Sequence, residues 1–181
     1  MNYIFLAGIG NSEPDHWQSI WFRALGGRWV EHADWEQPRA DAWVADLERA
    51  VQEVAGPKIL IGHSLGCLLA VEWARRHRNP DIKGSFLVAV PDVGGPNFPK
   101  AAAGFAPADA NAGPPPLPAL VVASTSDPYG SFASARRAAK AWGAAIASVG
   151  DRGHINLASN IGAWDEGRAL FDRFLAGLGG P

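Results

Sequence analysis

A serine between two glycines is the first feature of the sequence that points to chemistry. Ser64 lies in Gly62-His63-Ser64-Leu65-Gly66, directly after the apolar run 58–61 and directly before residues with helical spacing. The G-x-S-x-G pattern requires this strand-turn-helix context, because a sharp turn pushes the serine hydroxyl out of the sheet. The flanking glycines let neighbouring backbone approach without a clashing Cβ. The pattern predicts that Ser64 is a nucleophile, although such a turn also suits a serine that only caps a helix.

Asp127 and His154 are the candidates for the carboxylate and the base that a reactive serine needs. Asp127 follows the apolar run 119–123, and His154 lies in a glycine-flanked loop after the last predicted strand. Both follow the carboxyl ends of predicted parallel strands, where α/β sheets assemble their sites, and the order Ser, acid, His fits such a sheet. The rival Asp151 would need its loop to fold back on itself, so we favour Asp127. An Asp-Pro turn and an ordinary loop histidine are the alternatives without chemistry.

Backbone amides near Ser64 are the candidate donors to an oxyanion. Leu65 opens the predicted helix, so its N–H has no partner within that helix and can bind a developing negative charge. The turn Gly8-Ile9-Gly10 lacks the third glycine and the Lys-Ser/Thr ending of a phosphate loop. We expect it to supply the second donor, from the N–H of Ile9 or alternatively of Gly10.

Four residues are candidate substrate contacts: Gly10, His16, Trp17 and Tyr129. His16 and Trp17 lie in the first turn of a predicted helix, where an aromatic residue more often packs than binds, so a structural role is the favoured alternative for them. His63, next to the nucleophile, is expected to point away from it.

The elements that must position these residues alternate along the chain. Apolar residues at helical spacing predict helices, and apolar runs without alternation predict strands of a parallel sheet that is covered on both faces. We therefore expect one α/β domain over residues 1–181, a three-layer α/β/α sandwich with a mostly parallel sheet of about six strands. The predicted strands are 3–7, 29–32, 58–61, 85–90, 119–123 and 144–148, and the predicted helices are about 15–25, 43–54, 65–77, 131–142 and 170–178.

Residues 91–118 break this alternation. Proline and glycine are frequent there, the segment includes Pro114-Pro115-Pro116, and few apolar residues recur at a fixed spacing. The composition predicts a long surface loop. Loops of this length are often lids or binding loops, and an irregular connection is the alternative.

Composition excludes several classes of function. Of the 181 residues 48% are hydrophobic and 19% charged, which is typical of a folded globule, and the net charge is −2. The basic cluster Arg75-Arg76-His77-Arg78 lies where a helix should end and complements its dipole, so we expect no nucleic-acid partner. With Cys67 as the only cysteine and no His-Glu-x-x-His run, we expect no metal and no cofactor. No leader or bilayer-length apolar stretch is apparent, so we expect a cytoplasmic protein without a membrane partner.

Two further blocks make the chain similar to a known family. The first contains His16-Trp17-Gln18, and the second runs from Gly153-His154-Ile155-Asn156 through Trp164-Asp165-Glu166-Gly167. Together with G-x-S-x-G they resemble the compact serine hydrolases that include the bacterial YdeN-like proteins and retinoblastoma-binding protein 9. The resemblance covers nearly the whole chain. It implies the minimal α/β-hydrolase fold, with Ser64, Asp127 and His154 as a catalytic triad.

These observations predict a serine hydrolase of the carboxylesterase kind that cleaves small ester-like substrates through an acyl-enzyme. We expect a monomer or a weak homo-oligomer. A protein-interaction module on a hydrolase scaffold is the alternative, because a fold and even a triad do not fix function. Hydrolysis of thioesters or amides would use the same residues.

Overall fold

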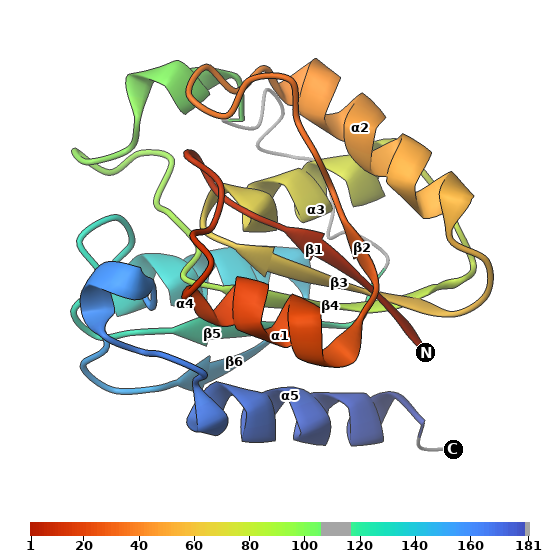
Figure 1. Ribbon diagram of the computed structural model, residues 1–181. Helices are drawn as coiled ribbons and strands as arrows, with labels where there is room; N and C mark the ends of the chain where they lie inside the picture. Colours follow the sequence, from red (N-terminus) through yellow and green to blue (C-terminus); the bar gives the residue numbers. More distant parts are fainter. Residues whose placement is uncertain (106–116, 180–181) are drawn as a thin grey trace.

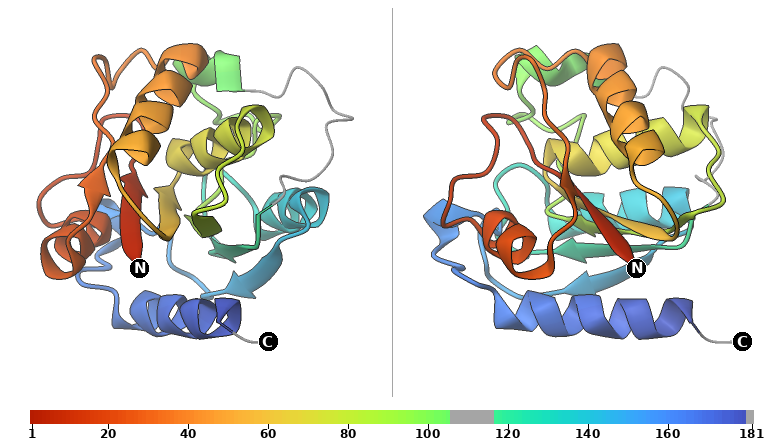
Figure 2. Two further views of the ribbon diagram at one scale, coloured as in Figure 1. Left: turned by 90° about the vertical axis from the view of Figure 1, so that its right-hand side faces the viewer. Right: turned by 45° about the vertical axis from the view of Figure 1, so that its right-hand side comes forward.

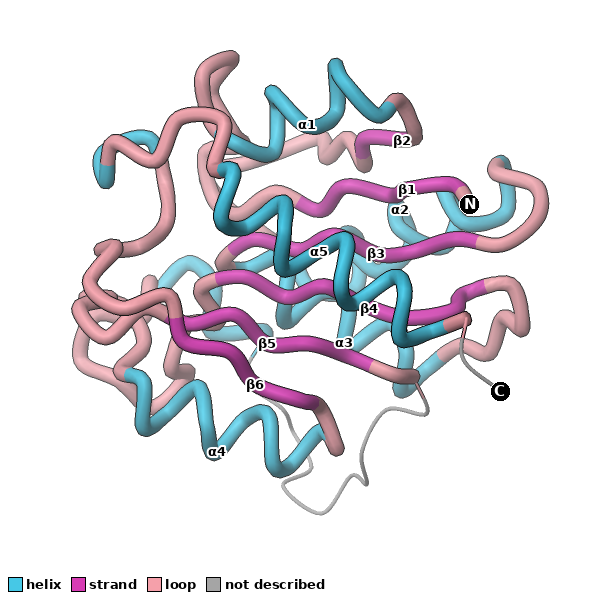
Figure 3. The backbone as a smooth tube through the Cα atoms, turned by 90° about the horizontal axis from the view of Figure 1, so that it is seen from below, coloured by secondary structure: helices cyan, strands magenta, loops and turns pink. Residues whose placement is uncertain are grey.

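A six-stranded sheet lies between two layers of helices in the computed structural model, which describes residues 1–105 and 117–179 (Figure 1). All neighbouring strands are parallel, in the order β2-β1-β3-β4-β5-β6, which can be followed in Figure 3. The expected α/β/α sandwich is thereby confirmed. The strands are β1 (Asn2–Leu6), β2 (Arg28–Trp29), β3 (Lys58–His63), β4 (Ile82–Val88), β5 (Ala119–Ala123) and β6 (Ala145–Ser148). The helices are α1 (Trp17–Leu25), α2 (Ala40–Glu53), α3 (Leu65–Arg76), α4 (Phe132–Trp142) and α5 (Asp165–Leu178), with short 3₁₀ helices η1 (Lys100–Phe105) and η2 (Leu157–Ser159).

Successive residues of the central strands belong to two different hydrophobic cores. In β3, Leu60 packs in the core that α2, α3 and α4 cover, whereas Ile59 and Ile61 pack in the core that α1 and α5 cover. The same alternation occurs in β1, with Leu6 in the first core and Phe5 in the second. Figure 2 shows α5 on one side of the sheet and α2 with α3 on the other. Both faces are covered, so these strands are apolar throughout.

The connections from β1 and β3 diverge at the carboxyl ends of these adjacent strands. β1 leads to α1 on one face of the sheet, and β3 leads to α3 on the opposite face. Such a divergence opens a crevice beyond the strand ends, and open α/β sheets bind their ligands there. The crevice lies at the end of β3, where the sequence places the G-x-S-x-G turn.

The prediction of a strand over residues 29–32 is wrong for most of these residues, because β2 covers only Arg28–Trp29. The chain turns towards α2 instead. The ring of His32 stacks on Trp43 with centroids 3.8 Å apart, and its Nδ1 lies 2.8 Å from Oδ2 of Asp46. These contacts with α2 draw the chain away from the sheet edge.

The segment predicted as one long surface loop is partly ordered against the core. Residues 100–105 form η1, and Ala102 and Phe105 are buried, with the Phe105 ring 5.6 Å from that of Trp43. The prediction is wrong for these residues, because their short 3₁₀ helix carries no long apolar period in the sequence. Residues 106–116 of the predicted loop lie outside the described residues.

Candidate active site

Ser64 occupies a strained position between β3 and α3. Its φ and ψ angles are 53° and −122°, a region that side-chain-bearing residues rarely adopt, and its N–H donates to the Val88 carbonyl at 3.0 Å. The turn is crowded: a Cβ added to Gly66 would lie 2.1 Å from the carbonyl oxygen of Leu6. Glycine at position 66 therefore lets the start of α3 pass close to the end of β1.

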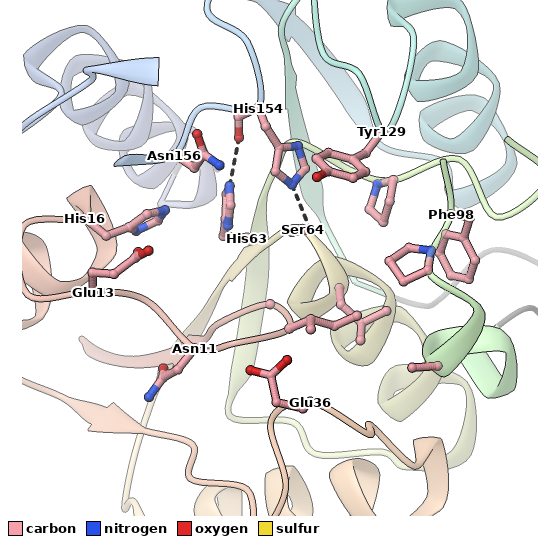
Figure 4. Close-up of a pocket in the computed structure, with 16 residues that line it drawn as sticks. Asn11, Glu13, His16, Glu36, His63, Ser64, Phe98, Tyr129, His154 and Asn156 are labelled. Atoms are coloured by element: carbon pink, nitrogen blue, oxygen red, sulfur yellow. Dashed lines mark hydrogen bonds between the residues drawn. The ribbon is translucent and has the colours of Figure 1, made fainter. Parts of the chain in front are cut away.

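A continuous hydrogen-bonded chain joins Ser64, His154 and Asp127. Nε2 of His154 lies 2.9 Å from Oγ of Ser64 (Figure 4). Its Nδ1 lies 2.9 Å from both carboxylate oxygens of Asp127. The carboxylate accepts only, so Nδ1 carries the proton and Nε2 is free to accept from the serine hydroxyl. The backbone N–H of Tyr129 donates to Oδ1 of Asp127 at 2.9 Å and helps fix the carboxylate. Ser64 directly follows β3, and Asp127 and His154 lie in the loops that follow β5 and β6.

The rival carboxylate Asp151 takes a different partner. It accepts a hydrogen bond from the Ser126 hydroxyl, and the same hydroxyl accepts from the Gly153 N–H at 3.0 Å. The Arg152 N–H donates in turn to Ser124 Oγ at 2.9 Å. Asp151 therefore helps to anchor the loop that carries His154.

The expectation that His63 points away from the nucleophile is wrong. Its Nε2 donates to the carbonyl of His154 at 2.9 Å, and the two rings lie 5.0 Å apart (Figure 4). His63 follows Ile59 and Ile61 at intervals of two, so it shares their face of the sheet, which is the face that the His154 loop reaches. The alternation of side chains between the two faces of β3 could have predicted this orientation from the sequence.

His16 and Trp17 differ in their relation to the cavity. His16 is 2% exposed, caps α1 by accepting from the Gln18 N–H at 3.1 Å, and also lines the cavity beside Ser64. Trp17 is 1% exposed, does not line the cavity, and donates from its indole to the Ile155 carbonyl at 2.9 Å. Trp17 therefore has the structural role that was the alternative to a substrate contact.

The two blocks that carried the family resemblance meet in space. The ring of Trp17 lies 5.1 Å from that of Trp164, and the indole of Trp21 donates to the Ala163 carbonyl at 2.9 Å. Gly167 makes room for this packing, because an added Cβ would lie 2.1 Å from the Trp164 ring. The first block thus supports the segment that carries His154.

Ile9 and Gly10 are the two candidates for the second oxyanion donor, and the hydrogen bonds of their N–H groups distinguish them. The Gly10 N–H donates to the Trp35 carbonyl at 3.1 Å, whereas the N–H groups of Ile9 and Leu65 have no acceptor among the described residues. Gly10 also lies outside the cavity lining, whereas Ile9 and Leu65 belong to it. A Cβ added to Gly8 would lie 3.5 Å from the Leu65 nitrogen, so the β1 turn approaches this amide closely.

A cavity of about 390 Å³ opens over Ser64 (Figure 4). Residues 91, 98, 99 and 101 of its lining belong to the segment 91–118, for which a binding loop was one of the two expectations. Sequence reasoning missed Asn11, Glu13, Glu36 and Asn156, because they lie in the loops that follow β1, β2 and β6, where no motif marks them. Their position after the carboxyl end of a strand is a sequence feature that could have identified them as candidate lining residues. The lining residues are Gly8, Ile9, Asn11, Glu13, His16, Glu36, His63, Ser64, Leu65, Pro91, Phe98, Pro99, Ala101, Tyr129, His154 and Asn156.

The cavity carries acidic side chains and neutral imidazoles. Burial lowers the pKa of His16 to about 4, helped by the nearby His154, and burial lowers the pKa of His63 well below its usual value. Both rings are therefore uncharged at neutral pH. Glu13 and Glu36 line the cavity, and none of the lining residues that the structure describes is Lys or Arg.

The described part of the chain has neither a cluster of metal-binding side chains nor a helix suited to a membrane. Within 1–105 and 117–179, no three His, Cys, Asp or Glu side chains gather in a way that could hold a metal ion. None of the helices in these ranges has both the length and the apolar character needed to span a bilayer.

Known proteins with similar sequences or structures include hydrolases. The serine hydrolase family matches residues 3–173. A Pectobacterium atrosepticum protein described as a YdeN-like hydrolase is 31% identical, with a TM-score of 0.85 over 98% of this chain and 91% of the other. The ydeN gene product of Bacillus subtilis is 17% identical and shares the fold, with a TM-score of 0.79 over 97% of this chain and 100% of the other.

A curated relative matches over a short stretch. Phospholipase YtpA of Bacillus subtilis is 45% identical over 47 residues, which is 26% of this chain and only 17% of that protein. The match with the serine hydrolase family, in contrast, covers most of the chain. The chain therefore has an α/β-hydrolase fold and belongs to the serine hydrolase family.

Proposed function

We propose that this hydrolase cleaves small ester-like substrates through a catalytic triad of Ser64, His154 and Asp127. The supporting observation is the hydrogen-bonded chain of these side chains, with all three donor–acceptor distances at 2.9 Å and with Ser64 opening on the cavity. Such a chain makes a hydroxyl reactive, because the imidazole takes its proton while the carboxylate orients the imidazole.

Acylation begins when Oγ of Ser64 attacks the ester carbonyl and Nε2 of His154 takes the hydroxyl proton. The negative charge that develops on the carbonyl oxygen is held by the N–H groups of Leu65 and Ile9, two amides of the cavity that have no acceptor among the described residues. The imidazolium then gives its proton to the leaving alcohol as the C–O bond breaks. Asp127 stabilises the imidazolium without accepting its proton.

Deacylation repeats these steps with water as the nucleophile. His154 takes a proton from the water, the hydroxide attacks the acyl carbon, and the carboxylic acid leaves as Ser64 regains its proton. No metal or redox group takes part in this sequence of steps.

The size of the cavity favours short substrates. Its volume of about 390 Å³ is near the lower end of the ~300–1,000 Å³ range of ligand pockets. The names of the relatives, a phospholipase and a YdeN-like hydrolase, are consistent with acyl-ester chemistry. We expect p-nitrophenyl acetate and butyrate to be cleaved with higher kcat/KM than the palmitate ester.

Labelling with a fluorophosphonate probe tests the nucleophile. Wild-type protein should be labelled at Ser64, and Ser64→Ala and heat-denatured protein should not. A matched variant, Ser131→Ala, changes an N-cap serine of α4 outside the cavity lining and should be labelled like the wild type. If native protein stays unlabelled while a control hydrolase reacts, the proposed function fails.

A further inference from the structure

The cavity has one polar side and one apolar side. We call His16, His63, Asn156 and Glu13 the polar flank, and Pro91, Phe98, Pro99 and Ala101 the apolar flank; all of them line the cavity. In Figure 4, His16, His63 and Asn156 gather on one side of Ser64, and Phe98 lies on the other. The triad uses no side chain of either flank, so both remain to be explained.

His16 presents a hydrogen-bond donor to the cavity. Its Nδ1 accepts from the Gln18 N–H at 3.1 Å, so the proton of the neutral ring must lie on Nε2. The residue is 2% exposed and lines the cavity, and none of the hydrogen bonds between described residues involves its Nε2. When a ligand displaces water from the cavity, this donor costs free energy unless the ligand accepts from it.

Asn156 and His63 add a second donor and an acceptor. Oδ1 of Asn156 accepts from the N–H of Ser159 at 3.2 Å and from its hydroxyl at 2.9 Å, which leaves the Asn156 NH₂ group without a described partner. His63 donates from Nε2 to the His154 carbonyl, so its Nδ1 carries only a lone pair. The polar flank therefore mixes donors with acceptors, and the Glu13 carboxylate adds further acceptor atoms.

This mixture matches hydroxyl groups better than ions. A hydroxyl both donates and accepts, whereas an ammonium group only donates and would leave the donors of His16 and Asn156 unpaired. A phosphate would meet Glu13 and Glu36 without any Lys or Arg among the described lining residues. The fitting ligand is a neutral group with several hydroxyls.

The position of His154 indicates which half of the substrate carries these hydroxyls. Its Nε2 must reach the leaving oxygen to return the proton, and the polar flank begins beside it, with the His63 ring 5.0 Å from the His154 ring. The His16 ring is a further 4.7 Å from that of His63. The side chains of the apolar flank offer no hydrogen-bonding atom and suit an acyl chain.

We propose that the polar flank binds the hydroxyl groups of a polyhydroxy alcohol as the leaving group, with His16 and Asn156 as the specificity-determining donors. The preferred substrates are then short-chain esters of neutral polyols of the glycerol type. This inference rests on the proposed function, since it assigns the leaving-group side of the same site.

The test compares glycerol monobutyrate with ethyl butyrate. Both esters form the same butyryl-enzyme, so the ratio of their kcat/KM values reports only on the leaving group. After correction for their alkaline hydrolysis rates, wild-type protein should prefer the glycerol ester by about tenfold or more, mainly through a lower KM, since each additional hydrogen bond contributes about fivefold. A ratio near one would overturn the inference.

The variant His16→Asn withdraws the donor from the position of Nε2, because the asparagine amide is shorter than the imidazole, and it keeps the helix cap, because asparagine is itself a favoured N-cap residue. The ratio should fall about fivefold. A merely structural role would lower both kcat/KM values equally and leave the ratio unchanged, which would overturn the assignment of His16. His77→Asn, at the far end of α3 from Ser64, is the matched control and should keep the wild-type ratio.

Two further esters distinguish other occupants of the polar flank. Butyrylcholine has a cationic alcohol, and ethyl 3,4-dihydroxybutyrate carries its hydroxyls on the acyl half. A higher kcat/KM for either than for glycerol monobutyrate would overturn the inference. Fluorophosphonate labelling distinguishes failure of this inference from failure of the proposed function. Labelled protein that shows no preference for the polyol ester contradicts only this inference. Protein that is not labelled contradicts the proposed function itself.

Discussion

Alanine at position 8 should abolish most of the activity while the fold persists. A Cβ at Gly8 would lie 3.0 Å from Cβ of Ser64, 3.4 Å from its Oγ and 3.5 Å from the Leu65 nitrogen. An oxyanion must come within about 2.7–3.1 Å of that amide, so the new methyl group occupies the space that the oxyanion needs. Loss of one such donor costs about 10²–10³-fold in kcat, or about 3–4 kcal/mol of transition-state stabilisation.

The same geometry limits the expected cost in stability. Gly8 does not have a positive φ, so alanine fits the backbone there, and its closest contact is a side-chain carbon that must give by a few tenths of an ångström. We expect a loss of about 1 kcal/mol in the free energy of unfolding, the low end for added bulk in a packed site. Urea unfolding measures this loss, and kcat/KM for p-nitrophenyl butyrate measures the activity.

Gly177→Ala is the matched control for Gly8→Ala. Gly177 is exposed in α5, and no atom lies within 4 Å of an added Cβ. Alanine there should raise the free energy of unfolding by about 0.5–1 kcal/mol and leave kcat/KM unchanged. If Gly8→Ala keeps kcat/KM within tenfold of the wild type, the oxyanion site does not lie between Ile9 and Leu65, and this reasoning is refuted.

Four substitutions test the choice of carboxylate, the turn and the cavity histidine. Asp127→Asn should lower kcat about 10⁴-fold, whereas Asp151→Asn should stay within about tenfold of the wild type; equal losses in esterase assays would contradict the choice of carboxylate. Gly66→Ala should destabilise the fold by about 4 kcal/mol or more, because its Cβ would lie 2.1 Å from the Leu6 carbonyl; a wild-type melting temperature would contradict this. The pKa of His16 is about 4 in the fold and 6.5 in the unfolded chain, so the unfolded state binds the extra proton and stability falls as the pH drops through this window. Between about pH 7.5 and about pH 4.5 the wild type should lose about 2 kcal/mol more than His16→Asn in urea unfolding, and parallel losses would contradict the neutral ring.

The central strands and the position of Ser64 were predictable because local signals agree there. An apolar run, a glycine-flanked serine and an apolar helix follow one another over residues 58–76, and the structure has β3 and α3 in these places. The positive φ of Ser64 is the strain that such a turn requires.

The predictions that are wrong depend on contacts between distant segments. The edge strand β2 ends at Trp29, because His32 leaves the sheet to stack on Trp43 of α2. In the same way, η1 is held by the burial of Ala102 and Phe105 rather than by a period in its own sequence. Neither partner can be identified from the local pattern.

The start of α1 shows why the block His16-Trp17-Gln18, which lies outside the triad, accompanies it. His16 lines the cavity, Trp17 holds the Ile155 carbonyl at 2.9 Å, and Gln18 donates to the carbonyls at positions 6 and 61 at 3.1 Å each. Successive helical residues point about 100° apart, so a single turn reaches the cavity, the His154 loop and the ends of β1 and β3 at once. A site of this kind needs its groups held within about 0.5 Å, and Ser64 and His154 come from different strands. The first turn of α1 contacts both the end of β3, which precedes Ser64, and the loop that carries His154, so its residues help to hold the distance on which proton transfer depends.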